Sequence, residues 1–427
     1  MELTPCRNPL KGHLRPPSDK SVTHRAILFS ALAPGACVIE HPLIAADTLS
    51  SRHVVESLGV TVRAEQDRWI LQSPGPQGWS KPQDVLDCGN SGTTMRLAMG
   101  LLAAGSGRYQ LSGDDSLSAR PMERVARPLR SMGIAVETQD GHAPVTVQGG
   151  VHHGTTYVMP VASAQVKSAI LLAAVTALGA TRVQEPYPTR DYTERMLRAM
   201  GAQVQHQEGF ITVEPSSLHL VDTMVPGDPS SAAFWAALAA LIPGSDLTLR
   251  EMSISPRRMG FYRLLQAMGA MVTTERKGAE GDVGDIRVAP GQLAGVTVLP
   301  EDIPDMIDEV PLLALVATQA QGETVISGAH ELRVKESDRI AATVTNLRAL
   351  GARIEEREDG MVIHGPTRLH GASVEAAGDH RMAMMLAVAA AVADGPVFLE
   401  GAQHVAISYP DFFTQYHQWT QGQPFAS

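Results

Sequence analysis

A short pattern occurs six times along this chain and sets the period of its fold. In each copy a polar cluster rich in Ser, Asp, Gly or His precedes an apolar, Ala-rich helix, and a glycine follows before a β-branched run. Each glycine is placed to end its helix in a left-handed C-cap. The chain is therefore predicted to contain six related units. Their glycines lie 65 to 78 residues apart in the 427-residue chain, at Gly35, Gly105, Gly179, Gly244, Gly322 and Gly395.

A second helix signal alternates with the first. It reads ESLGV, RSMGI, RAMGA, QAMGA and RALGA, with glycines at 59, 133, 201, 269 and 351. These helices are amphipathic, because their charged and apolar residues fall on opposite sides. Each unit therefore reads as strand–helix–strand–helix followed by further strands. The helices exclude a propeller, and the low identity between copies disfavours a solenoid.

Two compact α/β domains of three units each fit the length, because 427 residues are too many for one core. The sixth unit has a terminal helix but no strand after it, and the strand-like residues 1–15 can supply the missing part. The predicted domains are 16–225 and 1–15 plus 226–427. The chain then crosses twice between them, where prolines 16, 17 and 226 suit stiff hinges and closure over a substrate.

Composition narrows the class of protein. A net charge of −10 argues against a general nucleic-acid binder, and it requires any anionic substrate to meet local Lys and Arg side chains. Three cysteines give no disulfide framework and no metal-ligand spacing. The start MELTPCRNPL has no apolar signal region, and the longest apolar runs are too short to span a bilayer. We expect a cytoplasmic enzyme that acts as a monomer and binds neither nucleic acid nor membrane.

The openings of the apolar helices are candidate anion sites, because a helix N-terminus has unpaired N–H groups and a positive dipole end. SDKSVTHR places Lys20, Ser21 and Arg25 at the first opening. GNSGTTMR places Gly92 where an anion can approach the backbone closely, although no P-loop lysine follows. Taken singly, a capped surface helix or a tight turn explains each opening as well.

Later openings add neutral donors, acids and a further cation. ASAQVKS offers Ser163 and Gln165, which suit a phosphate or a polyol. IDEVP puts Asp308 and Glu309 at an opening, where an acid facing an anion site is a natural general base. GDHR puts Arg381 where a cation opposes the helix dipole, so an anion is expected to compensate. Ordinary capping and dipole effects are the competing explanations.

The amphipathic helices open on charged residues too. LSARPMER contains Arg120 and TRDYT contains Arg190. RVKESDR contains Lys335, Glu336 and Arg339, and the four-residue spacing of the two cations predicts that they share a helix face. A solvated, salt-bridged helix is the alternative. Collectively, cations at corresponding openings predict an enzyme whose substrates are phosphates.

Seven of these motifs together resemble the 5-enolpyruvylshikimate-3-phosphate synthase family. They are DKSVTHR, GNSGTTMR, SARPM, SAQVKSA, IDEVP, ELRVKESDR and GDHRMAM, which appear in the family's order and, with the later YPD segment, spread from residue 18 to residue 411. The resemblance implies the family's pair of inside-out α/β domains, each with three βαβαββ repeats. It also implies transfer of the enolpyruvyl group of phosphoenolpyruvate to the 5-hydroxyl of shikimate 3-phosphate, on the route to chorismate and aromatic amino acids.

The resemblance implies roles for particular residues. Asp308 would take the proton of the 5-hydroxyl, Glu336 would handle the proton at C3 of phosphoenolpyruvate, and Lys20 would assist. His380 would lie behind the substrate contacts. No metal or other cofactor is implied, because arginines meet the leaving phosphate. Shikimate 3-phosphate would contact Lys20, Ser21, Arg25, Ser163, Gln165, Arg190, Asp308 and Lys335. Phosphoenolpyruvate would contact Lys20, Gly92, Arg120, Gln165, Arg339 and Arg381.

One segment departs from the family pattern. Many members carry a lysine just before an aromatic-Pro-acid motif near the C-terminus, but here the segment reads AQHVAISYPD and no lysine follows Lys335. One phosphoenolpyruvate contact is therefore missing or replaced, with His404 as a candidate. Gly92 is retained where some herbicide-tolerant members carry a bulkier residue, so inhibition by glyphosate is predicted.

Two other functions remain open at this stage. The sister enolpyruvyl transferase acting on UDP-N-acetylglucosamine shares the fold and typically uses a cysteine in a mobile loop. Here Cys88 precedes the GNSG turn, and the segment around Arg120 contains no cysteine. A non-catalytic anion-binding repeat protein would bind both phosphates without releasing inorganic phosphate.

Overall fold

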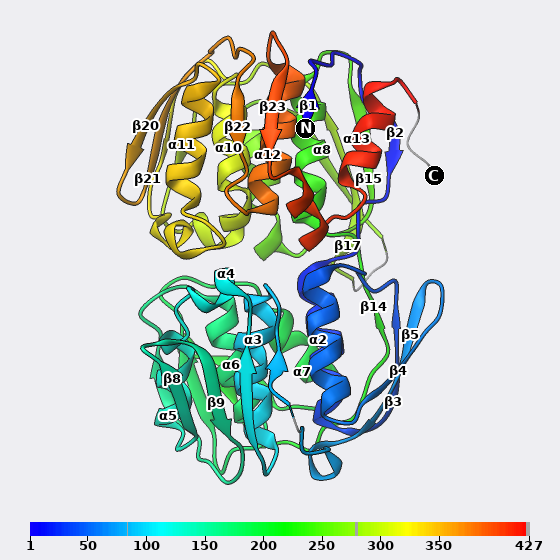
Figure 1. Ribbon diagram of the computed structural model, residues 1–427, viewed down its shortest axis with the longest axis vertical. Coiled ribbons are helices and arrows are strands. Elements are labelled where there is room, and N and C mark those ends of the chain that lie inside the picture. The colour runs from blue at the N-terminus through cyan, green and yellow to red at the C-terminus, as the bar shows by residue number, and fades with distance from the viewer. Residues whose placement is uncertain (83, 278–280, 424–427) are drawn as a thin grey trace. The chain divides into compact units, whose positions relative to one another are not determined.

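The computed structural model describes residues 1–82, 84–277 and 281–423, and the chain divides into two compact units. One unit is Ser18–Val225, which we call unit N. The other, unit C, consists of Met1–Pro17 and Pro226–Ser427. Figure 1 follows the chain through both units. No helix among the described residues combines the length and the apolar character needed to cross a membrane.

Unit N contains three four-stranded sheets of one design. In each sheet the first two strands are parallel and the remaining neighbours are antiparallel. The first sheet runs β14 (Thr223–Met224), β3 (Pro34–Glu40), β5 (Arg68–Pro74), β4 (Thr61–Ala64). The second runs β6 (Leu86–Asp87), β7 (Arg108–Ser112), β9 (His142–Gln148), β8 (Ala135–Gln139). The third runs β10 (Thr156–Val158), β11 (Thr181–Gln184), β13 (Phe210–Val213), β12 (Val204–Gln207).

Unit C repeats the design twice and ends with a three-stranded variant. Its first sheet runs β2 (Lys11–Leu14), β15 (Asp246–Ser253), β17 (Val283–Ala289), β16 (Met271–Arg276). Its second runs β18 (Thr297–Val298), β19 (Gly322–Ile326), β21 (Gly360–Gly365), β20 (Arg353–Arg357). Its third runs β22 (Ser373–Glu375), β23 (Val397–Glu400), β1 (Glu2–Leu3). The prediction that the N-terminal residues complete the sixth unit is confirmed, because β1 pairs with β23.

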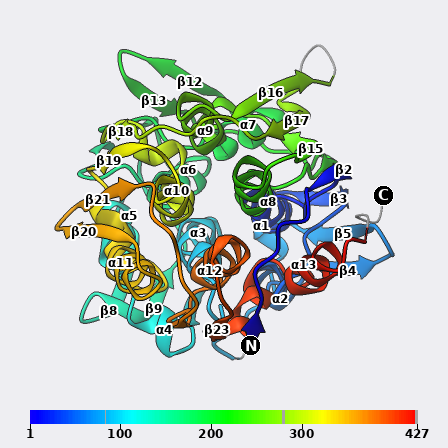
Figure 2. The same ribbon diagram turned by 90° about the horizontal axis from the view of Figure 1, so that it is seen from above.

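One apolar helix of each repeat lies in the core of its unit. These helices are α1 (Lys20–Phe29), α3 (Gly92–Leu101) and α6 (Ala164–Ala174) in unit N, and α8 (Pro229–Leu241), α10 (Val310–Ala317) and α12 (His380–Val392) in unit C. In α12 every residue from His380 to Val392 is buried. Figure 2 shows α8, α10 and α12 nearly end-on with the sheets of unit C outside them. The predicted α/β class, with helices inside and sheets outside, is confirmed.

The sequence explains where these helices begin. Asp19, Ser91, Ser163, Asp228 and Asp379 are the N-cap residues of α1, α3, α6, α8 and α12, and each side chain accepts a hydrogen bond from a backbone N–H of the first turn. Such caps satisfy donors that would otherwise be unpaired at a buried helix end. At these five openings, a backbone N–H of the first turn therefore has its hydrogen-bond partner within the chain.

The prediction that each apolar helix ends in a left-handed glycine is wrong. The six glycines follow their helices by three to six residues, and Gly105 and Gly395 are not in the positive-φ region. The left-handed C-cap belongs instead to the amphipathic helices, where Gly59 (φ 97°), Gly133 (φ 84°), Gly201 (φ 99°), Gly269 (φ 113°) and Gly351 (φ 93°) come two residues after the last helical residue. Those helices are α2 (Ala46–Ser57), α5 (Glu123–Ser131), α7 (Tyr192–Ala199), α9 (Gly260–Ala267) and α11 (Arg339–Ala349). A sixth, α13 (Phe412–Thr420), closes the chain, and a short α4 (Asp115–Ser118) precedes α5.

Candidate active site

In unit N the opening of α1 presents a lysine held by a buried acid. Lys20 is the first residue of α1, and its Nζ donates to Asp47 Oδ2 at 2.8 Å. Asp47 lies in the first turn of α2 and is buried. Because α1 and α2 are linked by this ion pair, the ammonium is fixed at the helix opening. Asp47 was not predicted, because its partner Lys20 lies 27 positions away in the sequence.

Arg25 is the best-placed cation of unit N for an anion. It is 3% exposed, and its guanidinium donates to Thr193 Oγ1 (2.9 Å), Ser168 Oγ (2.9 Å) and the carbonyl oxygen of Ser21 (3.0 Å). All three acceptors are neutral oxygens, so they orient the positive charge without cancelling it. Burial lowers the pKa of Arg25 to about 10, with Glu194 acting in the opposite direction. The side chain therefore stays charged at neutral pH and can form charge-assisted bonds to phosphate.

A buried chain of hydrogen bonds joins the openings of α1 and α3. His24 Nδ1 lies 2.7 Å from Ser51 Oγ, which is 2.7 Å from Thr94 Oγ1, which in turn donates to the N-cap Ser91 Oγ at 2.8 Å. Burial, Lys20 and the adjacent arginine of α1 together hold the pKa of His24 well below its ordinary value. His24 is therefore neutral, and the network adds no charge that would compete with an anion.

The opening of α3 brings Gly92, Arg120 and Gln165 together. A Cβ added at Gly92 would lie 3.2 Å from Arg120 Nη1. Arg120 Nη2 donates to Asn90 Oδ1 at 2.8 Å, which ties this arginine to the turn that precedes α3. Arg120 itself precedes α5, which begins at Glu123, so its position comes from the turn rather than from a helix.

Arg96 fixes the orientation of the Gln165 amide. Its Nη1 donates to Gln165 Oε1 at 2.6 Å, so the amide nitrogen must point the other way, where it donates to Thr93 Oγ1 at 2.9 Å. Arginine has donors only, which removes the ambiguity between the two ends of the amide. Arg96 was not among the predicted site residues, and its partner Gln165 lies 69 positions away in the sequence.

Two further predicted residues of unit N lie beside this group. Ser163 is the N-cap of α6, and its Oγ accepts from the backbone N–H of Val166 at 3.4 Å. Arg190 lies in the segment between β11 and α7, close enough to Arg25 to lower the pKa of that residue. Unit N thus gathers all eight of its predicted residues around the openings of α1, α3 and α6.

In unit C a single buried arginine organises the predicted residues. Arg339 is 1% exposed and is the first residue of α11. Its guanidinium donates to Asp379 Oδ2 (2.7 Å), to Glu336 Oε2 (2.7 Å) and to Asp308 Oδ1 (3.2 Å). Although burial works against the charged form, these three carboxylates raise the pKa of Arg339 above its ordinary value. Asp379, the fully buried N-cap of α12, was not predicted and fixes the arginine from behind.

Asp308 faces three cations. Its carboxylate oxygens lie 3.2 Å from Arg339 Nη1, 3.7 Å from Lys335 Nζ and 3.7 Å from Arg381 Nη2. Arg381 also lies 3.5 Å from Glu309 Oε1. Opposite charges at these distances favour the ionised carboxylate. Asp308 therefore lies among three cations that could also contact an anionic substrate.

The predicted helix pairing of Lys335 with Arg339 is wrong. Lys335 is the C-cap of the 3-10 turn η7 (His330–Val334) and has extended backbone geometry, whereas α11 begins only at Arg339. The two cations meet through Asp308 rather than along one helix face. Asp308 itself lies in a 3-10 turn, η6 (Ile307–Glu309), just before α10.

His380 and His404 occupy different surroundings. His380 is buried, with Nδ1 3.9 Å from Asp379 Oδ1. His404 lies in η8 (Ala402–Ile407), where its backbone N–H bonds to the carbonyl of Gly401.

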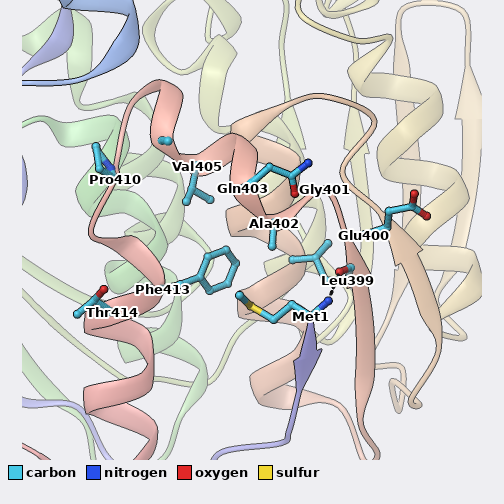
Figure 3. Close-up of a pocket in the computed structure, with 11 residues that line it drawn as sticks. Met1, Leu399, Glu400, Gly401, Ala402, Gln403, Val405, Pro410, Phe413 and Thr414 are labelled. Atoms are coloured by element: carbon cyan, nitrogen blue, oxygen red, sulfur yellow. Dashed lines mark hydrogen bonds between the residues drawn. The ribbon is translucent and has the colours of Figure 1, made fainter.

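A pocket of about 580 Å³ lies between β23, η8 and the start of α13, and Figure 3 shows Leu399 and Phe413 among its lining residues. The residues lining this pocket include none of the predicted site residues.

Among the described residues, no group of three or more His, Cys, Asp and Glu side chains is arranged to hold a metal ion. The two units carry different chemistry. Unit N presents Lys20, paired with Asp47, and Arg25 and Arg120, which donate to neutral oxygens, and this set of cations suits phosphate binding. Unit C presents carboxylates interleaved with cations, which suits proton transfer beside an anion.

Comparison with known proteins agrees with this chemistry. The family model described as EPSP synthase (3-phosphoshikimate 1-carboxyvinyltransferase) matches residues 6–416. A 3-phosphoshikimate 1-carboxyvinyltransferase from Persephonella marina is 46% identical over 414 residues, covering 95% of this chain and 96% of that protein. One from Geobacillus kaustophilus is 45% identical over 420 residues, covering 97% of this chain and 98% of that protein.

Solved structures give the same result. An EPSP synthase from Acinetobacter baumannii superimposes with a TM-score of 0.86 at 38% identity, covering 98% of this chain and 97% of that one. The enolpyruvyl transferase NikO from Streptomyces tendae shares the fold, with a TM-score of 0.77 at 21% identity, covering 97% of this chain and 95% of that one. Since the family model and the relatives each cover nearly the whole chain, this protein belongs to the EPSP synthase family of 3-phosphoshikimate 1-carboxyvinyltransferases.

Proposed function

We propose that this enzyme transfers the enolpyruvyl group of phosphoenolpyruvate to the 5-hydroxyl of shikimate 3-phosphate and releases phosphate. Membership of the EPSP synthase family supports the reaction. The observation that carries the proposal is the position of two carboxylates, Asp308 and Glu336, on one buried guanidinium, that of Arg339. An acid and a base held on the same cation can serve two proton transfers in one reaction.

Each substrate is assigned a set of side chains. For shikimate 3-phosphate the set is Lys20, Ser21, Arg25, Ser163, Gln165, Arg190, Asp308 and Lys335. For phosphoenolpyruvate the set is Lys20, Gly92, Arg120, Gln165, Arg339 and Arg381. The neutral partners of Arg25 support its assignment to a phosphate, because its charge is oriented and not neutralised. The amide of Gln165, oriented by Arg96, supports a donor role toward an anion.

The proposed chemistry uses three residues. Asp308 accepts the proton of the 5-hydroxyl as the oxygen forms a bond to C2 of phosphoenolpyruvate, and Glu336 donates a proton to C3, giving a tetrahedral intermediate. Glu336 then recovers a proton from C3 as the C2–O bond to phosphate breaks, and the proton held by Asp308 leaves with the phosphate. Lys20 stabilises the developing charge.

The leaving group needs stabilisation that arginines can give. Arg120, Arg339 and Arg381 are assigned to phosphoenolpyruvate, and charge-assisted hydrogen bonds contribute roughly 1.5–3 kcal/mol each. The proposed reaction therefore needs no metal and no further cofactor.

The test is phosphate release from phosphoenolpyruvate and shikimate 3-phosphate in the presence of a chelator. Asp308→Ala and Glu336→Ala are each expected to lower kcat by about 10²–10⁴-fold, the usual size of a general acid–base contribution. Turnover close to wild type in either variant would remove that residue from the mechanism. Dependence of turnover on added metal would contradict the proposed mechanism as a whole.

Other properties follow from the same proposal. The assigned domains, 16–225 and 1–15 plus 226–427, are supported by the two compact units.

We expect glyphosate to inhibit in competition with phosphoenolpyruvate, because Gly92 leaves space beside Arg120. An inhibition constant far above the KM for phosphoenolpyruvate would contradict this. We also expect a monomer, to be checked by sedimentation, in the cytoplasm, to be checked by fractionation.

The competing activity on UDP-N-acetylglucosamine gains no support. Relatives named 3-phosphoshikimate 1-carboxyvinyltransferase are 45–46% identical across the chain, and Cys88 is fully buried. Saturation with shikimate 3-phosphate and not with the sugar nucleotide is the discriminating measurement.

A further inference from the structure

An ion cluster inside unit N has no part in the proposed chemistry. Lys167, the fourth residue of α6, is 1% exposed. Its Nζ lies 2.8 Å from Glu194 Oε1 and 3.0 Å from Glu185 Oε2, and both carboxylates are almost fully buried. Burying one cation and two anions offers little net stability, because well-packed apolar residues usually do as well. Stability alone therefore does not account for this cluster.

The cluster holds the segment that carries Arg190. Lys167 Nζ donates to the backbone carbonyl of Thr189 at 3.4 Å. Glu185 Oε2 accepts from the Thr189 N–H at 3.4 Å, and Glu185 Oε1 accepts from the Thr189 hydroxyl. The backbone immediately before Arg190 is thus attached to α6 through one ammonium group.

The same cluster reaches the residues that hold Arg25. Glu194 follows Thr193 in α7, and Ser168 follows Lys167 in α6. Thr193 and Ser168 bond to each other at 2.7 Å, and each accepts a hydrogen bond from Arg25. One buried lysine therefore joins α6, α7 and the Glu185–Asp191 segment, the three elements that place Arg25 and Arg190.

We propose that Lys167 is a positioning residue for the phosphate of shikimate 3-phosphate, acting mainly through Arg190. The proposal rests on the proposed function, in which Arg25 and Arg190 bind that phosphate. Without the ammonium, Glu185 and Glu194 are two buried like charges that repel each other, so the segment before Arg190 moves. The loss falls on binding of the phosphate and spares binding of the ring.

The test is a double-mutant cycle read by calorimetric binding. Lys167→Met and Arg190→Gln are each expected to weaken binding of shikimate 3-phosphate about tenfold, the worth of one charge-assisted hydrogen bond. Binding of shikimate, which lacks the phosphate, stays within twofold. The affinity of the double variant for shikimate 3-phosphate equals that of the single variant with the lower affinity, because both changes remove the same contact. Lys167→Arg retains most of the affinity.

A matched control separates positioning from general destabilisation. Arg52, in α2, forms an ion pair with Glu56 and lies over the ring of Trp69 in β5, away from residues 185–191. Arg52→Met is expected to leave both affinities unchanged. If Lys167→Met does not fold, Glu185→Gln gives the same prediction, since the amide has one acceptor oxygen where the carboxylate uses two to hold Thr189.

Three results would overturn the proposal. They are additive losses in the double variant, equal weakening of shikimate and shikimate 3-phosphate, and an unchanged affinity in Arg190→Gln. Arg25→Gln distinguishes these from failure of the proposed function. If it weakens binding of shikimate 3-phosphate, the phosphate assignment stands and only the role of Lys167 is lost. If it too has no effect, the phosphate assignment is wrong.

Discussion

Gly92 is a position where one added carbon would disturb the proposed phosphoenolpyruvate site. A Cβ there would lie 3.2 Å from Arg120 Nη1, so this guanidinium would have to move by a few tenths of an ångström, whereas Arg96 Nη1, at 3.4 Å, would be at the edge of ordinary contact. We expect Gly92→Ala to fold normally, to raise the KM for phosphoenolpyruvate about tenfold, and to weaken glyphosate inhibition more than that. Steady-state kinetics with both substrates measures this.

The KM for shikimate 3-phosphate is the internal control for that substitution. It should stay within twofold, because Arg25 does not adjoin Gly92. Equal increases in both KM values would show that the substitution disturbs the whole opening of α3 instead of the phosphoenolpyruvate contacts.

His24 gives the protein a predictable response to pH. Its pKa in the folded state lies well below the ordinary value of 6.5, mainly because of burial. Below pH 6.5 the unfolded chain therefore binds a proton at this position that the folded chain does not. The free energy of unfolding should fall by up to about 1.4 kcal/mol per pH unit from this residue as pH decreases below 6.5.

Urea unfolding of wild type and His24→Gln at pH 7.5, 6.5 and 5.5 measures this contribution. The difference between the two proteins should be constant above pH 6.5 and should shift in favour of the variant below it. Parallel pH profiles would show that His24 titrates alike in the folded and unfolded chains and that the burial argument is wrong.

The residues proposed to contact the substrates were predicted more readily than the residues that hold those side chains in place. The cations and the acid–base pair stand in short motifs at helix openings, where helix physics gives them meaning. Asp47, Arg96 and Asp379 act through partners 27, 69 and 40 positions away. One sequence contains no signal for such pairs, since only the packing of helices brings them together.

At the scale of elements, periodicity identified the helices but not the ends of the apolar ones. Gly133 follows an amphipathic helix by two residues and is left-handed, as a C-cap requires. Gly105 follows α3 only after a 3-10 turn, Leu102–Ala104, and has ordinary φ. Short 3-10 turns have no pattern of their own in a sequence, so helix ends and the Lys335 position could not be predicted correctly.

The residues just before α12 include an alanine, Ala377, in a strained backbone conformation. Ala377 has φ 52°, a region that costs an alanine roughly 1 kcal/mol relative to glycine. It lies two residues before Asp379, the N-cap that holds Arg339. We expect Ala377→Gly to increase the free energy of unfolding by about 0.5–1 kcal/mol with little change in kcat, measured by urea unfolding and steady-state kinetics.

The neighbouring glycine supplies a matched control. Gly378 has φ 73°, and a Cβ there would meet nothing within 4 Å. Gly378→Ala should therefore destabilise by about 1 kcal/mol through the backbone alone. If both substitutions change stability in the same direction, backbone strain is not the cause.

At the scale of the whole chain, one strand of each unit lies next in sequence to the first helix of the other unit. By sequence, β2 precedes α1 of unit N, yet it pairs in parallel with β15 of unit C. In the same way β14 precedes α8 of unit C but pairs in parallel with β3 of unit N. The repeat period predicted six units and a contribution from residues 1–15, because the last unit lacked a strand. Periodicity could not show that β2 completes the sheet of the fourth repeat and β14 the sheet of the first.

This arrangement of the strands predicts how fragments of the chain behave. Residues 18–225 contain every strand of their three sheets, so this fragment should unfold cooperatively by itself. Residues 226–427 lack β1 and β2, and with them the buried Leu3, Leu10 and Leu14 of the unit C core. Each buried leucine contributes roughly 1.5–3 kcal/mol, which is large against a typical stability of about 5–15 kcal/mol. Fragment 226–427 alone should therefore be unfolded or only partly folded.

A peptide comprising residues 1–17 should restore the structure of fragment 226–427, because its contacts with that fragment are extensive. Met1 Nα donates to Leu399 O, Trp419 Nε1 donates to Asn8 O, and β2 adds a parallel edge to β15. Circular dichroism and urea unfolding with increasing peptide would measure the restoration. A peptide in which Leu3, Leu10 and Leu14 are replaced by Ser is the control and should not restore it. Cooperative unfolding of fragment 226–427 without any peptide would show that the core of unit C is complete without β1 and β2.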